Sequence, residues 1–141
     1  MAHVVCSYCS ATNRIGDGYD AREAKCGRCG KVLFDGHAVD IAATVLEKHI
    51  AKSDIPVLVD VWAPWCGPCR VMGPEFEAAA GRGEPAMRFV KLNSDDNQEM
   101  AARLGIRGIP TMIMFREGRE VARTSGAMSS TEILRWASRQ T

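Results

Sequence analysis

Six cysteines are the residues of this chain best suited to chemistry, and all six follow one spacing. They form three Cys-x-x-Cys pairs: Cys6/Cys9, Cys26/Cys29 and Cys66/Cys69. A gap of two residues suits either a redox-active dithiol or half of a tetrahedral metal site. It suits a structural disulfide poorly, because a disulfide usually stabilises more when it closes a longer loop. The spacing therefore predicts metal binding, redox chemistry or both.

The third pair lies in the segment Trp65-Cys66-Gly67-Pro68-Cys69. Residues 57–62, just before it, form an apolar run that predicts a buried strand, and residues 70–80, just after it, have helical character. This junction places Cys66 at a helix N-terminus, where free backbone N–H groups and the helix dipole favour the thiolate. Because the thiolate is the species that attacks disulfides, the segment predicts thiol–disulfide exchange.

The first two pairs are separated by sixteen residues, which is the spacing of a four-thiolate zinc ribbon. The predicted ligands are Cys6, Cys9, Cys26 and Cys29. Residues 1–36 contain many turn-forming residues and few large apolar ones, so burial alone cannot order them. Gly30 after the second pair allows a tight turn around sulfur, whereas Ser10 after the first is less suited. Iron is the alternative metal, and four free thiols in an unordered arm are the alternative to a metal site.

The composition fits a small globular protein without a strongly charged partner. The 141 residues carry 18 basic and 17 acidic side chains, and 46% are hydrophobic, which is enough for a packed core. So balanced a charge argues against binding to nucleic acid or to an anionic membrane. No apolar stretch approaches the roughly 20 residues that span a bilayer, and the first residues lack the pattern of a signal peptide. We expect a cytoplasmic protein, in which metal and redox roles for cysteine are favoured over structural disulfides.

These patterns predict two parts of unequal size: a zinc-ribbon segment, residues 1–36, and a second domain, residues 37–141. Helices and strands alternate in the second part, which predicts an α/β fold whose mixed sheet is covered on both faces. Ser129 and Glu132 fit a capping box at the start of the last helix. Strands are expected at 57–62, 87–92, 111–115 and 120–124, and helices at 41–51, 70–80, 97–104 and from 129 onward.

Residues 38–141 resemble the thioredoxin family. The resemblance rests on four segments in order: 60–69, 91–93, 105–111 and 126–127. The four-cysteine segment resembles that of the zinc-containing bacterial thioredoxins of type 2. The resemblance implies a thioredoxin fold, a central mixed sheet flanked by helices, with a small N-terminal zinc ribbon. It also implies the activity of a protein-disulfide reductase.

The resemblance gives each residue around the dithiol a role. Cys66 is the nucleophile that forms a mixed disulfide with the client, and Cys69 resolves it. Asp60 is implied to be buried behind the second cysteine, where a desolvated carboxyl has a raised pKa and can accept the proton of Cys69. A solvated carboxylate at the strand edge is the alternative. Gly67 and Pro68 shape the turn into the helix.

Four residues are implied to meet the client. Trp65 adds apolar surface, and the small Gly126 completes that surface. Pro110 matches the cis-proline of the family, which lets the backbone of Ile109 pair with an extended client segment. An ordinary trans proline in a turn is the alternative. Outside this client surface, Lys91 is expected either to pair with the carboxylate of Asp60 or to be solvated.

In the implied reaction, the reduced dithiol cleaves a client disulfide, and thioredoxin reductase, a flavin enzyme that uses NADPH, then restores the dithiol. Ribonucleotide reductase, peroxiredoxins and methionine sulfoxide reductases are the implied clients. We expect one structural Zn²⁺, no bound organic cofactor, no nucleic acid or membrane partner, and a monomer.

Two other functions remain as alternatives. One is an oxidase or isomerase, which is disfavoured because Gly67-Pro68 supplies no charge to stabilise a thiolate further. The other is a zinc-ribbon binding module for nucleic acid or protein, whose basic side chains are nearly cancelled by acidic ones. The ribbon itself is either structural or redox-regulatory, because zinc-bound thiolates can oxidise once exposed.

Overall fold

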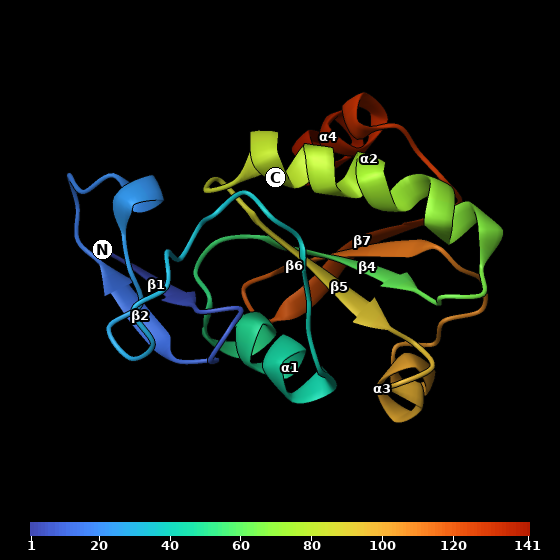
Figure 1. Cartoon of the computed structure of the whole chain (residues 1–141), viewed down its shortest axis with the longest axis horizontal. Coiled ribbons are helices and arrows are strands. Elements are labelled where there is room, and N and C mark those ends of the chain that lie inside the picture. Colours follow the sequence, from blue (N-terminus) through green and yellow to red (C-terminus); the bar gives the residue numbers. More distant parts are fainter.

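A five-stranded mixed sheet forms the centre of the molecule in the computed structural model, which describes all residues 1–141 (Figure 1). The strand order is β3-β5-β4-β6-β7, so that β4 pairs in parallel with β5 on one side and antiparallel with β6 on the other. The strands are β3 (Val39–Asp40), β4 (Val57–Trp62), β5 (Arg88–Asn93), β6 (Thr111–Arg116) and β7 (Arg119–Ser125). A separate antiparallel pair, β1 (Ala2–Val5) and β2 (Thr12–Ile15), precedes them.

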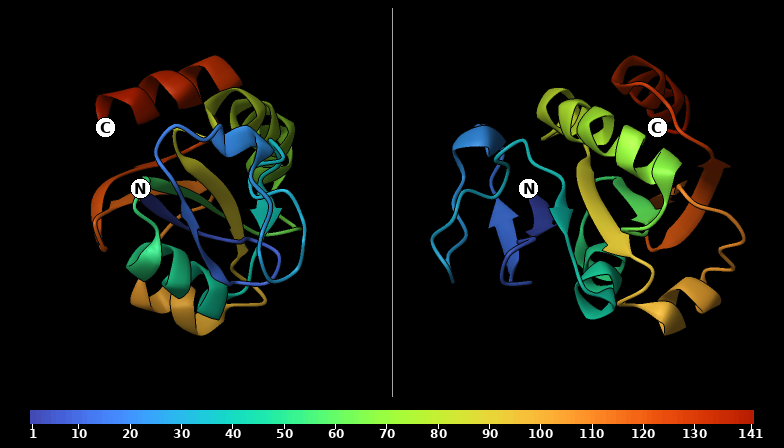
Figure 2. Two further views of the ribbon diagram at one scale, coloured as in Figure 1. Left: turned by 90° about the vertical axis from the view of Figure 1, so that its left-hand side faces the viewer. Right: turned by 45° about the vertical axis from the view of Figure 1, so that its right-hand side comes forward.

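Helices cover both faces of the sheet, α2 and α4 on one face and α1 and α3 on the other (Figures 1 and 2). Their bounds are α1 (Ala43–Lys52), α2 (Gly67–Gly83), α3 (Gln98–Arg103) and α4 (Ser130–Arg139), and a short 3-10 helix spans Ala21–Glu23. The predicted capping box is present, because Ser129 and Glu132 exchange hydrogen bonds at the start of α4. This arrangement confirms the predicted α/β class and the thioredoxin fold. No helix combines the length and apolar character that crossing a membrane requires.

The strands after residue 56 and all four helices lie close to their predicted positions. The helix after the dithiol is longer than predicted, Gly67–Gly83 rather than 70–80; it begins earlier because Cys66 caps it directly. Strand β3 and the β1–β2 pair were not predicted. These strands are two to four residues long, too short to show a clear alternation of apolar and polar residues.

Strand β4 separates two apolar layers, because successive side chains of a strand point to opposite faces. Leu58 packs with residues of α2 and α4, whereas Val57, Val59 and Val61 pack with residues of α1 and α3. Asp60 lies two residues after Leu58, so it faces α2. An acidic side chain is thereby placed inside an apolar layer.

The ribbon segment, residues 1–36, packs at the end of the sheet where β4 and β5 begin (Figure 1). Its small core includes Val4, Leu33 and Phe34, and Ile55, just before β4, packs against that core. The 17-residue helix α2 is about 25 Å long at 1.5 Å per residue. Because the ribbon segment lies near the C-terminal end of α2, the four ribbon cysteines and the Cys66–Cys69 pair occupy opposite ends of the molecule.

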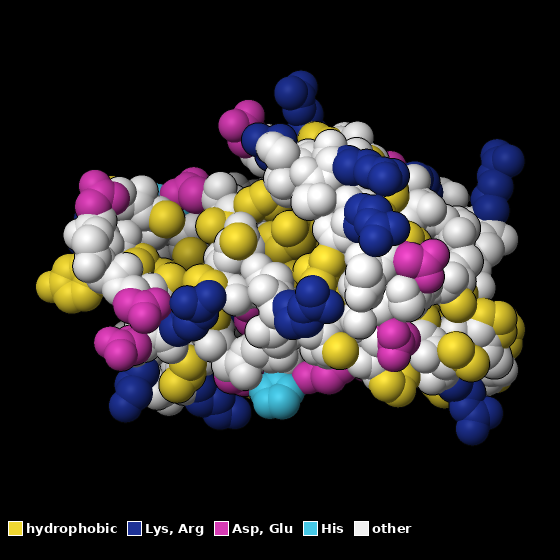
Figure 3. All heavy atoms as spheres, turned by 90° about the horizontal axis from the view of Figure 1, so that it is seen from above, with side chains coloured by type: hydrophobic (Ala, Val, Ile, Leu, Met, Phe, Trp, Pro, Cys, Tyr) yellow, Lys and Arg dark blue, Asp and Glu magenta, His cyan; other side chains and the backbone are white.

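On the side of α2 and α4, acidic and basic side chains are intermixed across the surface (Figure 3). This distribution agrees with the balanced composition of the chain, and it gives no extended field of one sign on this face.

The C-terminal end of α2 requires a glycine at one position. A Cβ atom added to Gly83 would lie 2.4 Å from the ring of Phe89 and 3.2 Å from Leu134. A Cβ atom added to Gly81, one half-turn earlier, would lie 3.7 Å from the carbonyl oxygen of Gly36, which is an ordinary contact.

Gly83→Ala is therefore expected to lower the free energy of unfolding by about 1–3 kcal/mol, because the buried Phe89 ring must move. Gly81→Ala is the matched control and should leave stability unchanged or raise it by up to about 1 kcal/mol through helix propensity. Urea denaturation of both variants measures the difference. Equal stability of the two variants would show that the Gly83 contact does not constrain the fold.

Candidate active site and metal centre

Cys66 caps the N-terminus of α2. Its sulfur accepts a hydrogen bond from the backbone N–H of Cys69 at 3.2 Å, and the two cysteines form a disulfide with their Cα atoms 5.2 Å apart. Pro68 stands in the first turn of α2, where its missing N–H costs no helical hydrogen bond. After reduction, the same N–H group and the helix dipole favour a thiolate at Cys66.

The loop before β6 meets the dithiol. The Ile109–Pro110 peptide bond is cis, as the resemblance implies, and the carbonyl oxygen of Ile109 lies 3.7 Å from the sulfur of Cys66. Pro110 is tied to the next loop, because its carbonyl oxygen accepts the N–H of Gly126 at 2.9 Å. Gly126 has φ of 103°, a conformation that favours glycine. Trp65 is 69% exposed beside Cys66, so all four residues implied to contact the client lie near the dithiol.

Asp60, on β4, is buried, with 1% of its area exposed. Neither of its carboxylate oxygens has a hydrogen-bond partner. Burial raises its pKa to about 7; the positive charge of Lys91 opposes this shift and the negative charge of Asp40 adds to it. The alternative of a solvated strand-edge carboxylate is wrong. Asp60 is a carboxyl that can change protonation near neutral pH.

Asp40, Lys91 and Asp60 occupy one row across β3, β5 and β4. Lys91 makes no ion pair with Asp60; its ammonium group lies 4.5 Å from the ring centre of Trp62. The indole N–H of Trp62 donates to Asp40 at 3.2 Å. Asp40 is a charged neighbour of the site that the sequence analysis missed, because its place beside Lys91 depends on the pairing of the two-residue strand β3.

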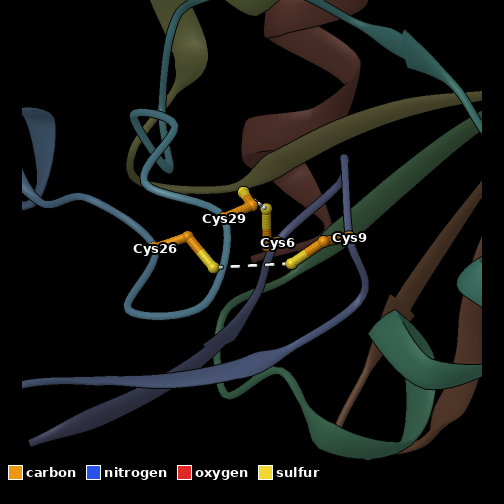
Figure 4. Close-up of side chains that lie close together, drawn as sticks. All are labelled: Cys6, Cys9, Cys26 and Cys29. Carbon is orange, nitrogen blue, oxygen red and sulfur yellow. Dashed lines mark hydrogen bonds between the residues drawn. The ribbon is translucent and has the colours of Figure 1, made fainter.

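The four remaining cysteines converge at the other end of the molecule (Figure 4). Their sulfur atoms all lie within 4.8 Å of one another. Cys6 and Cys29 are 3.7 Å apart, and Cys9 and Cys26 are 3.5 Å apart, measured between sulfur atoms. A tetrahedral zinc with Zn–S bonds of about 2.3 Å requires sulfur atoms roughly 3.8 Å apart. The predicted ligands are therefore brought together at a spacing that fits a metal ion.

The two loops that carry these cysteines have the same backbone hydrogen bonds. Ser10 donates to the carbonyl oxygen of Cys6 at 2.9 Å, and Gly30 donates to that of Cys26 at 2.9 Å. Both donors have positive φ, 64° for Ser10 and 79° for Gly30. The first loop thus has the geometry of the second although serine replaces glycine. Ser10 was expected to suit this turn less well than Gly30, but it adopts the same conformation.

Donors surround one of the sulfur atoms. The backbone N–H of Arg28 and the side-chain amide of Asn13 each lie 3.4 Å from the sulfur of Cys26. Hydrogen bonds, chiefly from the backbone of Cys29, lower the pKa of Cys26, whereas burial raises the pKa of Cys6. Asn13 also accepts the N–H of Gly27 at 2.9 Å. Asn13 was not singled out from the sequence, since its role depends on the pairing of β1 with β2.

Comparison with known proteins decides the family. The thioredoxin family model matches residues 37–139. The chain belongs to the thioredoxin family. Thioredoxin C-3 of Corynebacterium nephridii is 35% identical over 137 residues, covering 97% of this chain and 94% of that protein. Thioredoxin of Pseudomonas aeruginosa is 38% identical over 97 residues, covering 69% of this chain and 90% of that protein.

Solved structures agree with this assignment. The X-ray structure of Fasciola hepatica thioredoxin superposes with a TM-score of 0.65 at 34% sequence identity and covers 74% of this chain and 99% of that chain. This thioredoxin is a protein-disulfide reductase with a redox-active Cys66–Cys69 pair. The four-cysteine cluster in residues 1–36 supports the resemblance to the zinc-containing type 2.

The raised pKa of Asp60 gives a pH-dependent stability. The folded protein keeps this carboxyl protonated up to a pH of about 7, whereas the unfolded chain ionises it near 3.8. Between these values the folded state binds more protons, so the contribution of Asp60 to stability falls as pH rises through this window.

Asp60→Asn is expected to stabilise the oxidised protein at pH 8 by up to about 4 kcal/mol, the free-energy equivalent of the difference between the two pKa values. At pH 4 the variant and the parent should have nearly equal stability. Urea denaturation at both pH values measures this, with the exposed Asp96→Asn as the control. A stabilisation of the same size at both pH values would contradict the burial of an ionisable carboxyl.

Proposed function

We propose that Cys66 is the attacking thiolate of this thioredoxin, that Cys69 is its resolving thiol and that Asp60 is the proton acceptor. The observation that carries the proposal is the buried Asp60, which has no hydrogen-bond partner and stands on β4, the strand that leads to the dithiol at the N-terminus of α2. A carboxyl with a pKa of about 7 can take a proton from a thiol and release it near neutral pH.

The reaction has two exchange steps. The Cys66 thiolate attacks one sulfur of the client disulfide; a Cys66–client disulfide forms, and the other client sulfur leaves as a thiolate that takes up a proton. Cys69 then passes its proton to Asp60 and attacks the sulfur of Cys66. The Cys66–Cys69 disulfide forms, and the second client sulfur leaves as a thiolate and is protonated. Two electrons pass from the dithiol to the client.

The client binds across the surface around Cys66. An extended client segment pairs with the backbone of Ile109, as an added strand would, because the carbonyl oxygen of Ile109 lies 3.7 Å from the sulfur of Cys66. A cavity of about 330 Å³ beside Ile109, lined in part by Ala101 and Ile106, offers room for an apolar client side chain. Trp65 and Gly126 form the rest of the contact surface, and Gly67 and Pro68 shape the turn that presents Cys66.

Thioredoxin reductase restores the dithiol in this proposal, because the family in general works with that enzyme and with disulfide-containing client proteins. The reaction requires reducing conditions, so we place the protein in the cytoplasm. We propose that it acts as a monomer. We keep the division between the ribbon segment, residues 1–36, and the thioredoxin domain, residues 37–141, as a prediction.

Zinc is the proposed metal at the four ribbon cysteines. Four thiolates at tetrahedral spacing suit Zn²⁺, and a bound Zn²⁺ would supply the cross-link that the small core of residues 1–36 needs. We propose a structural role for it. A redox-regulatory role is the second candidate, because Cys29 is exposed and an oxidant can reach it.

Substitution of the dithiol tests the assigned roles. Cys66→Ser with Cys69→Ser is expected to abolish insulin disulfide reduction, and Cys69→Ser alone should accumulate a mixed disulfide with a client, detected by intact mass. Asp60→Asn should slow reduction at pH 7 by roughly 10-fold to 100-fold, since the proton of Cys69 loses its acceptor. The control for Asp60→Asn is the exposed Asp96→Asn, which should reduce insulin at the parental rate. Full activity of the Cys66→Ser, Cys69→Ser variant would refute the mechanism.

Metal analysis of the purified protein tests the zinc assignment. One zinc per chain is expected, and Cys26→Ser should reduce the zinc content because a tetrahedral site loses one of its thiolates. The Cys66→Ser, Cys69→Ser variant is the matched control and should keep its full zinc content. Protein without metal, or with iron in place of zinc, would show that the assignment is wrong.

A further inference from the structure

Arg88, the first residue of β5, is a buried cation that contacts the ribbon segment from the thioredoxin domain. It is 2% exposed and is the largest of the fully buried side chains. One arm of its guanidinium donates to the carbonyl oxygen of Val5 at 3.0 Å, and the other donates to that of Leu33 at 2.7 Å. Val5 directly precedes Cys6, and Leu33 follows Cys29 by four residues. A single side chain therefore holds the backbone next to both pairs of metal-ligating cysteines.

No other side chain of the thioredoxin domain forms hydrogen bonds with both halves of the ribbon segment. His49, which is fully buried in α1, contacts the hydroxyl of Ser7 at 3.3 Å, and the Ser53 hydroxyl accepts the N–H of Val5 at 3.2 Å. Asp54 bonds to the backbone N–H of His3 at 2.6 Å. All three contact the first half of the ribbon segment, whereas Arg88 bonds to both halves.

The surroundings of Arg88 match a fixed positive charge. Its guanidinium lies 3.4 Å from a carboxylate oxygen of Glu84, whose side chain is 2% exposed, and stacks over the ring of Phe34 at 4.3 Å. The same Glu84 oxygen accepts the backbone N–H of Phe89 at 3.2 Å. A buried charge of this kind is costly unless it is paired, so removing Arg88 alone would leave the buried carboxylate of Glu84 without its counter-charge.

The geometry also explains why arginine stands here. A planar guanidinium presents several N–H groups in a rigid fork, so that it can bond to two carbonyl oxygens and a carboxylate at once. A lysine ammonium is a compact charge on a flexible stem. In addition, four thiolates around Zn²⁺ carry a net negative charge, and a cation in the adjacent low-dielectric interior opposes that charge.

We propose that Arg88 is a positioning residue of the metal centre, which fixes the two cysteine pairs relative to each other. Because Arg88 belongs to β5, the retention of zinc then depends on the packing of that strand. The inference rests on the zinc assignment proposed above. Groups that orient metal ligands from outside the coordination sphere typically change metal affinity by about 10-fold to 100-fold when they are removed. Arg88 acts through the backbone of the ligand segments rather than through a ligand side chain.

Zinc transfer from the intact protein to an excess of a chromogenic chelator tests the proposal. Arg88→Met is expected to release zinc about 10-fold to 100-fold faster than the parent. Arg88→Lys, which keeps the charge but loses the fork, should release it nearly as fast as Arg88→Met. Arg103→Met removes an exposed arginine paired with Glu47 and should release zinc at the parental rate.

A second control separates this role from general destabilisation. Ile133→Ala opens the core between α2 and α4 and destabilises the domain without touching the ribbon segment. Parental release from Arg88→Met or Arg88→Lys, or equally fast release from Ile133→Ala, would overturn the proposal. Parent protein that contains no zinc would instead refute the metal assignment, and this inference with it.

Hydrogen exchange of the unsubstituted protein gives an independent measurement that does not depend on the folding of a variant. The reporter is the Phe89 N–H, which donates to the carboxylate paired with Arg88. After zinc is removed under reducing conditions, this amide should exchange about 10-fold faster or more, while amides of β6 change less. Unchanged exchange at Phe89 after complete removal of zinc would contradict the link between the metal centre and β5.

Discussion

The hydrogen bonding of β4 on both sides is the constraint on which both sites depend. With β5 and β6 as neighbours, β4 has no free edge, and its side chains alternate between two apolar layers. Asp60 is buried because this alternation turns it toward the layer that α2 and α4 cover. Strand β4 ends just before Cys66. The residues that precede the strand, 53–56, contact the ribbon segment, and the carbonyl oxygen of Pro56 accepts the backbone N–H of Arg88 at 2.8 Å. One strand thus leads to the dithiol at one end and supports the four-cysteine cluster at the other.

Two buried acids show how partners decide the role of a carboxyl. Burial raises the pKa of both Asp60 and Glu84 to about 7. Glu84 has the guanidinium of Arg88 and a backbone N–H as partners, so its charge belongs to a fixed ion pair. Asp60 has no hydrogen-bond partner, so nothing holds its proton in place. The same desolvation therefore makes one carboxyl part of the framework and leaves the other free to exchange protons with a thiol.

Local patterns predicted the parts of this molecule that local forces determine. The strand before the dithiol, the cap of α4 at Ser129 and the division of the six cysteines into one dithiol pair and one cluster of four followed from neighbouring residues. Arg88 and Asp40 did not. A charged residue in a strand has the pattern of a solvent-facing position, so the burial of Arg88 cannot be recognised until a distant segment covers it. The ribbon segment covers Arg88, and the pairing of β3 places Asp40. Both depend on contacts between residues far apart in the chain.

The opposite placement of the two cysteine sites also determines how this protein can be attached to other molecules. The amino terminus lies in the ribbon segment, at the far end of the molecule from the start of α2 (Figure 1). A fusion partner or a solid support joined there would therefore face away from Trp65 and the client surface. The amino terminus is thus a point of attachment that leaves the dithiol and the surface around it accessible.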